Sequence, residues 1–232
     1  MQPAPTSLRQ TLTGRLPRHS HRAAYAAIVL EGGYVEAGDA GRYKVEAGDM
    51  LVHASFQAHQ NSFDRNGAKV LNLPVGAERA PIALRIADTD AIVRVAERDA
   101  RAASALAFSM VKCALSFCED WPDLLAEALR RNRVSSIEEW AEEIGLARTS
   151  VSRGFARAYG VAPQRYRLQN RASRAARMIV GTSATLAQIS DACGYSDQSH
   201  MTRDFTRFIG ATPARLRHHH VTRVQDGIAP VR

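Results

Sequence analysis

The chain has 232 residues, 45% of them hydrophobic, and a formal net charge of +8 at pH 7. This length predicts two domains of ordinary size, and no run approaches the roughly 20 apolar residues that a membrane-spanning helix needs. The N-terminal stretch has no apolar core of a signal peptide and the three cysteines lack metal spacing, so we expect a reducing cytoplasm and no membrane partner.

The basic charge is concentrated in the C-terminal half. Residues 1–120 have a net charge of +1, whereas residues 121–232 contain 17 arginines, no lysine and a net charge of +7. The planar guanidinium group binds phosphate and guanine bidentately, so this half is suited to nucleic acid. A GC-rich genome accounts for the missing lysines, but it does not account for the asymmetry between the halves.

The first part of the chain alternates short apolar segments with glycine turns. A polar, proline-containing arm over residues 1–18 leads into expected strands at 23–30, 34–37, 41–45, 50–52, 70–73 and 82–86. Turns are expected at 31–33, at Gly38-Asp39 and at Gly48-Asp49. Short strands at this spacing predict a small barrel or jelly roll over residues 1–86.

Histidines recur among these strands. His19-x-His21 and Gly48-Asp49-x9-His59 resemble the paired motifs of the cupin fold, although Tyr25 stands where the first motif has a glutamate. The resemblance implies that His19, His21 and His59 converge on a divalent metal such as zinc, nickel or iron. The other interpretation is that they bond turns or line an apolar pocket, and His53 is expected to be structural or a pocket wall.

Residues 87–118 have helical spacing. Asp88 or Thr89 can cap a first helix, and a second is expected to start at Ala100 and to continue through Leu106 to Phe117. Their apolar faces need a partner. Packing against the chain's own barrel and packing against a second copy in a homodimer both remain open for this linker.

The C-terminal region, residues 121–217, repeats one pattern. A shift of fifty residues superposes seven identical residues: Arg203, Phe205, Arg207, Gly210, Pro213, Arg215 and Arg217 on Arg153, Phe155, Arg157, Gly160, Pro163, Arg165 and Arg167. Before each copy come a capping-box pattern and a glycine turn: Ser136 to Glu139 with Gly145, and Thr185 to Gln188 with Gly194. Two helix-turn-helix units joined by a helix over 163–179 are therefore predicted.

Each second helix has an apolar stripe and a polar side. Val151, Phe155 and Tyr159 in the first copy, and Met201, Phe205 and Phe208 in the second, recur at helical spacing and are expected to face inward. Each of these helices also carries polar side chains that can reach base edges and phosphates, and these are expected on the side of the helix away from the apolar stripe.

The stretch Gly194-Tyr195-x-Asp197-x-Ser199-His200-x-x-Arg203-x-Phe205, continued by Arg207, Gly210, Thr212-Pro213 and Arg217, resembles the signature of AraC/XylS transcription regulators. The resemblance implies two recognition helices in successive major-groove segments of double-stranded DNA, and a cupin-like N-terminal sensor for a small-molecule effector or metal. It also implies RNA polymerase as a partner of an activator. The implied DNA-binding residues are Thr149, Ser152, Arg153, Gln198, Ser199, His200, Thr202 and Arg203. Ala147 replaces the serine cap that relatives have.

The predicted fold is therefore α+β and multidomain: a cupin-like barrel (1–86), a helical linker (87–118), an all-α DNA-binding domain (121–217) and a flexible tail (218–232). We expect a regulator and no enzyme. The alternative is a metal-dependent cupin enzyme with a DNA-binding appendage, although no paired carboxylates lie near the histidines in the sequence. A third interpretation is a protein that coats DNA without sequence preference.

Overall fold

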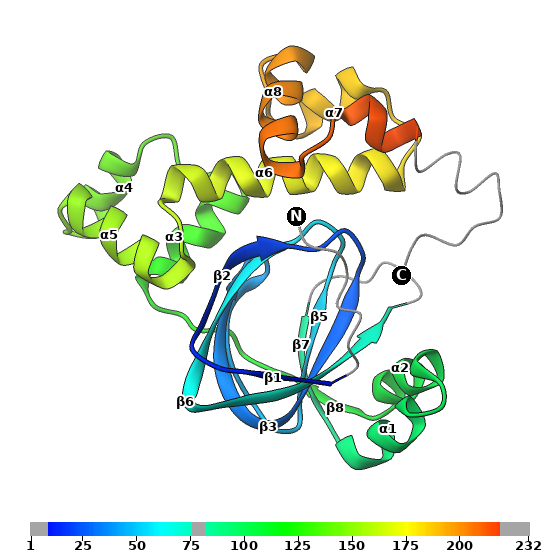
Figure 1. Ribbon diagram of the computed structural model, residues 1–232. Coiled ribbons are helices and arrows are strands. Elements are labelled where there is room, and N and C mark those ends of the chain that lie inside the picture. The colour runs from blue at the N-terminus through cyan, green and yellow to red at the C-terminus, as the bar shows by residue number, and fades with distance from the viewer. Residues whose placement is uncertain (1–8, 76–81, 219–232) are drawn as a thin grey trace.

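The computed structural model describes residues 9–75 and 82–218. It has an N-terminal antiparallel sheet and a helical C-terminal part, which lies over one end of the sheet (Figure 1). Within the described residues, no helix has the length and apolar character to cross a membrane. The tail predicted for 218–232 lies outside the described residues except for His218, the last residue of a short helical segment over 213–218.

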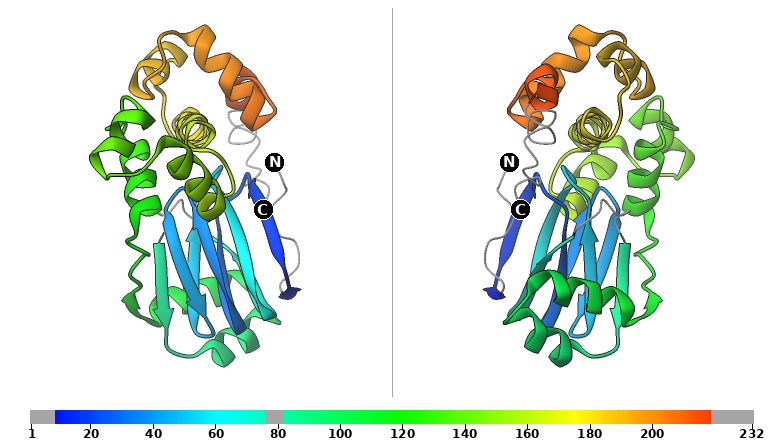
Figure 2. Two further views of the ribbon diagram at one scale, coloured as in Figure 1. Left: turned by 90° about the vertical axis from the view of Figure 1, so that its left-hand side faces the viewer. Right: turned by 90° about the vertical axis from the view of Figure 1, so that its right-hand side faces the viewer.

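All strand pairs of the eight-stranded sheet are antiparallel. The order is β1-β6-β3-β5-β7-β8, with β2 also paired to β6 and β4 to β3. The sheet is strongly curved. Two helices, α1 (Thr89–Ala96) and α2 (Ala100–Ser109), lie at the end of the sheet that is far from the C-terminal helices (Figure 2). The strands are β1 (Arg9–Leu12), β2 (Arg15–Ser20), β3 (Tyr25–Gly38), β4 (Gly41–Glu46), β5 (Asp49–His53), β6 (Ala58–Pro74), β7 (Ile82–Ile86) and β8 (Val111–Ala114).

Both faces of the sheet are buried, which explains the continuous apolar run that begins β3. Successive side chains of a strand point to opposite faces. Ala26 and Ile28 join a cluster that α1 (Thr89–Ala96) and α2 (Ala100–Ser109) cover, whereas Ala27 and Val29 join a second cluster on the other face. The apolar faces of the linker helices therefore pack against the chain's own sheet, as one of the two open interpretations held.

Three local predictions about this part are wrong. The arm expected over residues 1–18 is partly strand, because β1 and β2 both pair with β6. Residues 31–33 form no turn, since β3 continues through them with a bulge at Gly32, whose φ is +71°. The second linker helix ends at Ser109 rather than Phe117, because residues from Val111 pair with β7 as an edge strand.

The C-terminal part consists of two helix pairs, α4–α5 and α7–α8, a long helix, α6, between them, and α3, which packs against the first pair. The first pair packs near the start of α6 through Tyr166, and the second packs on its later half through Ala172 and Ile179 (Figure 1). The helices are α3 (Trp121–Arg130), α4 (Ile137–Glu143), α5 (Arg148–Tyr159), α6 (Pro163–Gly181), α7 (Leu186–Ala192) and α8 (Gln198–Ile209).

The predicted caps explain where these helices start. Ser136 accepts from two first-turn N–H groups of α4, and Thr185 and Gln188 form a complete capping box at α7. Asp197, rather than Ser196, caps α8 by accepting from the His200 N–H at 2.7 Å. Ala147 at the start of α5 gives no side-chain cap, as its methyl group requires.

Glycines close the same helices and turns. Gly145 and Gly194 have φ of +68° and +73°, and Gly160 and Gly210 both end their helices at +76°. This left-handed region costs a residue with a Cβ free energy, so glycine is favoured at all four positions. The connecting helix runs through Gly181 and is capped at Thr182, two residues beyond its predicted end at 179.

The inward stripe of α5 is Val151, Phe155 and Tyr159, all fully buried, as predicted. In α8 the buried stripe is Met201, Phe205 and Ile209, and the predicted Phe208 is only half-buried. The spacing i, i+4, i+8 therefore recurs in both helices at the fifty-residue offset.

Candidate DNA-binding surface and histidine cluster

The outward side of α5 carries the three residues predicted for DNA contact. Thr149 and Arg153 are exposed, and Ser152 is half-buried. The Arg153 Nε donates to the Thr149 carbonyl at 3.4 Å, a contact at the long limit of a hydrogen bond. The guanidinium group of Arg153 forms no ion pair within residues 9–75 and 82–218, so its charge is available to a partner.

The outward side of α8 carries the other five predicted residues. Gln198, Ser199 and Arg203 are exposed. The Thr202 hydroxyl donates to the Gln198 carbonyl at 2.8 Å, so this hydroxyl is already engaged inside the helix. His200 and Thr202 are half-buried.

His200 is held by its own helix pair. Its Nδ1 lies 3.0 Å from the Ser196 hydroxyl, its Nε2 lies 3.6 Å from an Asp204 carboxylate oxygen, and its ring meets Tyr195 edge-on. Sequence reasoning did not foresee these contacts, which give His200 a positioning role inside the unit.

Arg171 of α6 contacts the second helix pair. Its Nη1 donates to the Gly194 carbonyl at 2.9 Å and its Nη2 lies 3.7 Å from Asp204. The guanidinium group also lies over the Tyr195 ring at 4.4 Å. Arg171 therefore ties the connecting helix to the turn and the second helix of the second pair.

Comparison with known proteins matches residues 140–219 to the family described as "Helix-turn-helix domain". The HTH-type transcriptional regulator ArgR of Pseudomonas aeruginosa is 32% identical over 76 residues, 33% of this chain and 23% of its own length. The HTH-type transcriptional activator RhaS of Pectobacterium atrosepticum is 29% identical over 91 residues, 38% of this chain and 33% of its own length. The chain thus spans a third or less of these relatives.

Among solved structures, an AraC-type DNA-binding domain protein from Chromobacterium violaceum is 26% identical, with a TM-score of 0.38 over 41% of this chain and 88% of that one. The C-terminal part of the present chain is a helix-turn-helix domain. More particularly, this part is similar to a transcriptional regulator that contains an AraC-type DNA-binding domain.

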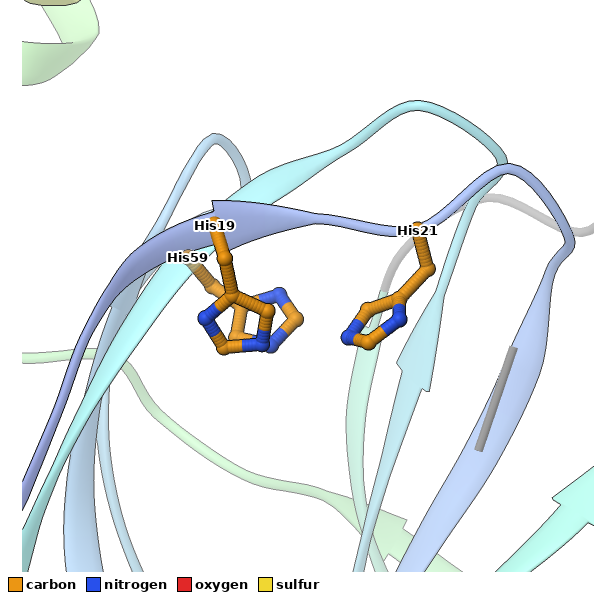
Figure 3. Close-up of side chains that lie close together, drawn as sticks. All are labelled: His19, His21 and His59. Atoms are coloured by element: carbon orange, nitrogen blue, oxygen red, sulfur yellow. The ribbon is translucent and has the colours of Figure 1, made fainter. Parts of the chain in front are cut away.

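The second candidate site lies in the sheet. The rings of His19 and His21 are 4.9 Å apart and those of His19 and His59 are 4.5 Å apart, centroid to centroid, and the three rings gather on one side of their strands (Figure 3). One possible ligand atom from each of the three lies within 4.8 Å of the others. The structure therefore brings the three predicted histidines together.

The chemistry of these rings fits a divalent metal. The His19 Nδ1 lies 2.8 Å from the Pro17 carbonyl, an arrangement that leaves the opposite nitrogen for a metal. The buried His59 Nδ1 has no hydrogen-bond partner among the described residues. Burial lowers the pKa of His59 well below its usual value, so the ring is neutral and its lone pair can bind a cation.

Two further residues join this cluster. Glu36, His53 and His59 also bring possible ligand atoms within 4.8 Å of one another, and all three are buried. Burial raises the pKa of Glu36 to about 8 and lowers that of His53 to about 3. Sequence reasoning missed Glu36, although an acidic residue within the buried stretch that ends β3 was a usable signal.

The sheet is fastened to the connecting helix by four residues, here called the clamp: Arg18, Asp39, Tyr166 and Gln169. Arg18 and Asp39 form a buried ion pair, and the Arg18 Nε donates to Gln169 Oε1 at 2.9 Å. The Arg18 guanidinium lies over the Tyr166 ring at 4.9 Å, and the Tyr166 hydroxyl donates to the Gly38 carbonyl at 3.3 Å. The clamp therefore starts one residue from His19.

Phe56 makes a second connection. Its backbone N–H donates to the His21 carbonyl at 2.8 Å, and its side chain belongs to the buried cluster of the second helix pair with Ala172, Met201 and Phe205. One connection thus starts at Arg18, the chain neighbour of His19, and the other starts at His21 through its hydrogen bond with Phe56. Both lead to the helical part.

Proposed function

We propose that this protein is a sequence-specific DNA-binding transcription regulator, in which α4–α5 and α7–α8 are two helix-turn-helix units and α5 and α8 are the recognition helices. One observation carries the proposal. The two helices bury equivalent stripes at a fifty-residue offset and leave the equivalent Arg153 and Arg203 exposed. An exposed arginine on each of two helices fixed to one connecting helix is the arrangement that successive major-groove segments require.

The proposed DNA-binding residues have distinct tasks. Gln198 is suited to adenine, whose N6 and N7 match an amide, and Arg153 and Arg203 are suited to guanine or to phosphate. Thr149, Ser152 and Ser199 supply hydroxyl groups, Thr202 acts mainly through its methyl group, and His200 positions the second helix.

We further propose that the N-terminal sheet is a cupin-like barrel that senses a small molecule or a divalent metal through His19, His21 and His59. A ligand changes DNA affinity only if it binds two arrangements of the protein with different affinity. The clamp and Phe56 are the routes by which those arrangements reach α6 and the second unit. A cytoplasmic location, a homodimer and contact with RNA polymerase belong to the same proposal.

The test is selection of a preferred site from random duplexes with the full chain, followed by footprinting. Protection of two segments about one helical turn apart, roughly 34 Å, is expected. Equal affinity for the selected site and for random DNA contradicts sequence-specific binding. Operator affinity that no metal and no small molecule changes contradicts the sensing role while leaving the DNA-binding role intact.

A metal-dependent enzyme is the second candidate, and the histidine cluster is the observation that favours it. The two candidates differ in one assay on the purified protein. Stoichiometric metal together with turnover of a small substrate supports the enzyme, whereas metal without turnover supports a sensor.

A further inference from the structure

The strand register places three potential metal ligands on three strands. Glu36 of β3 lies opposite Asn61 of β6, and Gly38 lies opposite His59. His53 of β5 lies opposite Tyr25 of β3, and its ring stacks on the Tyr25 ring at 4.4 Å. Ligands held on three paired strands are fixed more rigidly than ligands on loops.

A glycine makes room for this arrangement. A Cβ at position 38 would lie 3.1 Å from the His59 Cβ and 3.3 Å from the Ala58 carbonyl oxygen, both closer than ordinary contact. Without a side chain at Gly38, β3 can lie this close to His59 of β6, and Glu36, two residues away, shares the same face of β3.

The polar groups of this inner set are incompletely satisfied. Asn61 Nδ2 donates to Glu36 Oε2 at 3.1 Å, which orients the carboxylate, but His53 Nδ1 is 3.6 Å from Glu36 Oε1 and too far for a hydrogen bond. The buried His59 Nδ1 and Asn61 Oδ1 have no hydrogen-bond partner in the described part of the chain. Buried polar atoms without partners are costly, so each unpaired atom calls for a bound group.

We propose that Glu36, His53 and His59 bind a divalent transition metal and form the inner, primary half of the sensing site. The inference rests on the proposed sensing function and names its ligand class. Two imidazoles and one carboxylate are a common set for zinc, which keeps a fourth position open. Because two of these three ligands are nitrogen atoms, the set disfavours magnesium and calcium, which bind oxygen ligands. His19 and His21 then lie at the outer side, where His19 is only half-buried.

The test is a titration of the metal-free full chain with cobalt(II), followed by visible absorption, with zinc competition for affinity. Glu36→Gln and His53→Gln are each expected to weaken binding about tenfold or more. The matched control is Glu31→Gln, an exposed acid on the same strand, which is expected to stay within about threefold of wild type because it removes no ligand. His19→Gln removes a ligand of the outer set, and a smaller loss of affinity than in the two inner variants is expected.

Three results overturn the inference: no stoichiometric binding by wild type, unchanged affinity in both inner variants, or a loss confined to His19→Gln. X-ray absorption of the zinc-loaded wild type gives a measurement independent of folding in any variant. Coordination of the zinc by two imidazoles and a carboxylate supports the inference, and coordination by three imidazoles without a carboxylate contradicts it. Operator binding by the metal-free variants separates this failure from failure of the DNA-binding proposal.

Discussion

The two helix pairs of the C-terminal part share one sequence pattern but have different surroundings. The first pair is docked on the sheet: Gln60 of β6 donates to the Ala158 carbonyl at 2.7 Å beside Gly160, while the Arg42 guanidinium binds Asp123 of α3 at 2.8 Å. At the second pair, the equivalent Gly210 has open space around it. Two units with the same internal design thus differ in which residues of the N-terminal part contact them.

The largest expected effect tests whether the pairs unfold separately. Phe155→Ala and Phe205→Ala each remove a fully buried ring, so each should cost about 3–5 kcal/mol of folding free energy. Both tryptophans, Trp121 and Trp140, lie at the first pair, so fluorescence during urea unfolding reports that pair alone. Only Phe155→Ala should move the fluorescence midpoint, and an equal shift in both variants would show that the pairs unfold together. The control is Phe208→Ala, which removes a half-buried ring from the same helix as Phe205 and should cost less folding free energy.

Alanine at the two closing glycines compares the surroundings of the two pairs directly. Both positions have φ of +76°, so left-handed strain of about 1–2 kcal/mol is common to Gly160→Ala and Gly210→Ala. At Gly160 the added Cβ would also lie 2.2 Å from Gln60 Oε1. Gly160→Ala should therefore lower the thermal midpoint more than Gly210→Ala, and the gap should close in a Gln60→Ala background. Equal midpoints for the two variants would contradict docking at this point.

Removing the exposed arginines compares the two recognition helices. Arg153→Ala and Arg203→Ala should each weaken binding to the selected site by about 1–3 kcal/mol if each reads a base. Gel-shift titrations on selected and random duplexes measure the difference. An equal loss on both duplexes shows a phosphate contact, and no loss for one of the two arginines removes that helix from the interface. Arg131→Ala, at an exposed arginine that pairs with Glu127, is the control.

The smallest expected effect concerns the clamp. Gln169→Ala removes the acceptor for the Arg18 Nε and should cost about 0.5–1.5 kcal/mol of stability. The same change should reduce any effect of an added metal on operator affinity. Gln164→Ala, an exposed glutamine on the same helix, should change neither quantity. A metal response that is identical in Gln169→Ala and wild type excludes the clamp as a route.

Local sequence signals predicted the helical part well. Ser136, Thr185 and Asp197 cap the helices they precede, because a short polar side chain can satisfy first-turn N–H groups wherever the chain is otherwise helical. The stripe of α8 was misplaced by one residue, from Ile209 to Phe208, since both are apolar and only the packing against α6 decides between them.

The pairing of strands that are far apart in the chain could not be predicted from the sequence. Val111 starts an edge strand because β7 offers it a partner, and Gly32 bulges within one strand because Gly67 on the neighbouring strand comes close. The candidate metal site shows the same division. The resemblance to the cupin motifs predicted that His19, His21 and His59 would gather, whereas Glu36 and His53 join them only through the register of three strands.

Phe56 has a left-handed backbone, with φ of +61°, although it is neither glycine nor asparagine. Such a conformation costs a bulky residue on the order of 1–3 kcal/mol and persists only while its surroundings hold it. Contact with the second helix pair must offset that cost, so separating the sheet from the helices releases stored energy as well as exposing apolar surface. The docked arrangement is correspondingly less favourable than its buried contacts suggest, which lowers the binding energy that the proposed sensing mechanism needs from a ligand at the histidines.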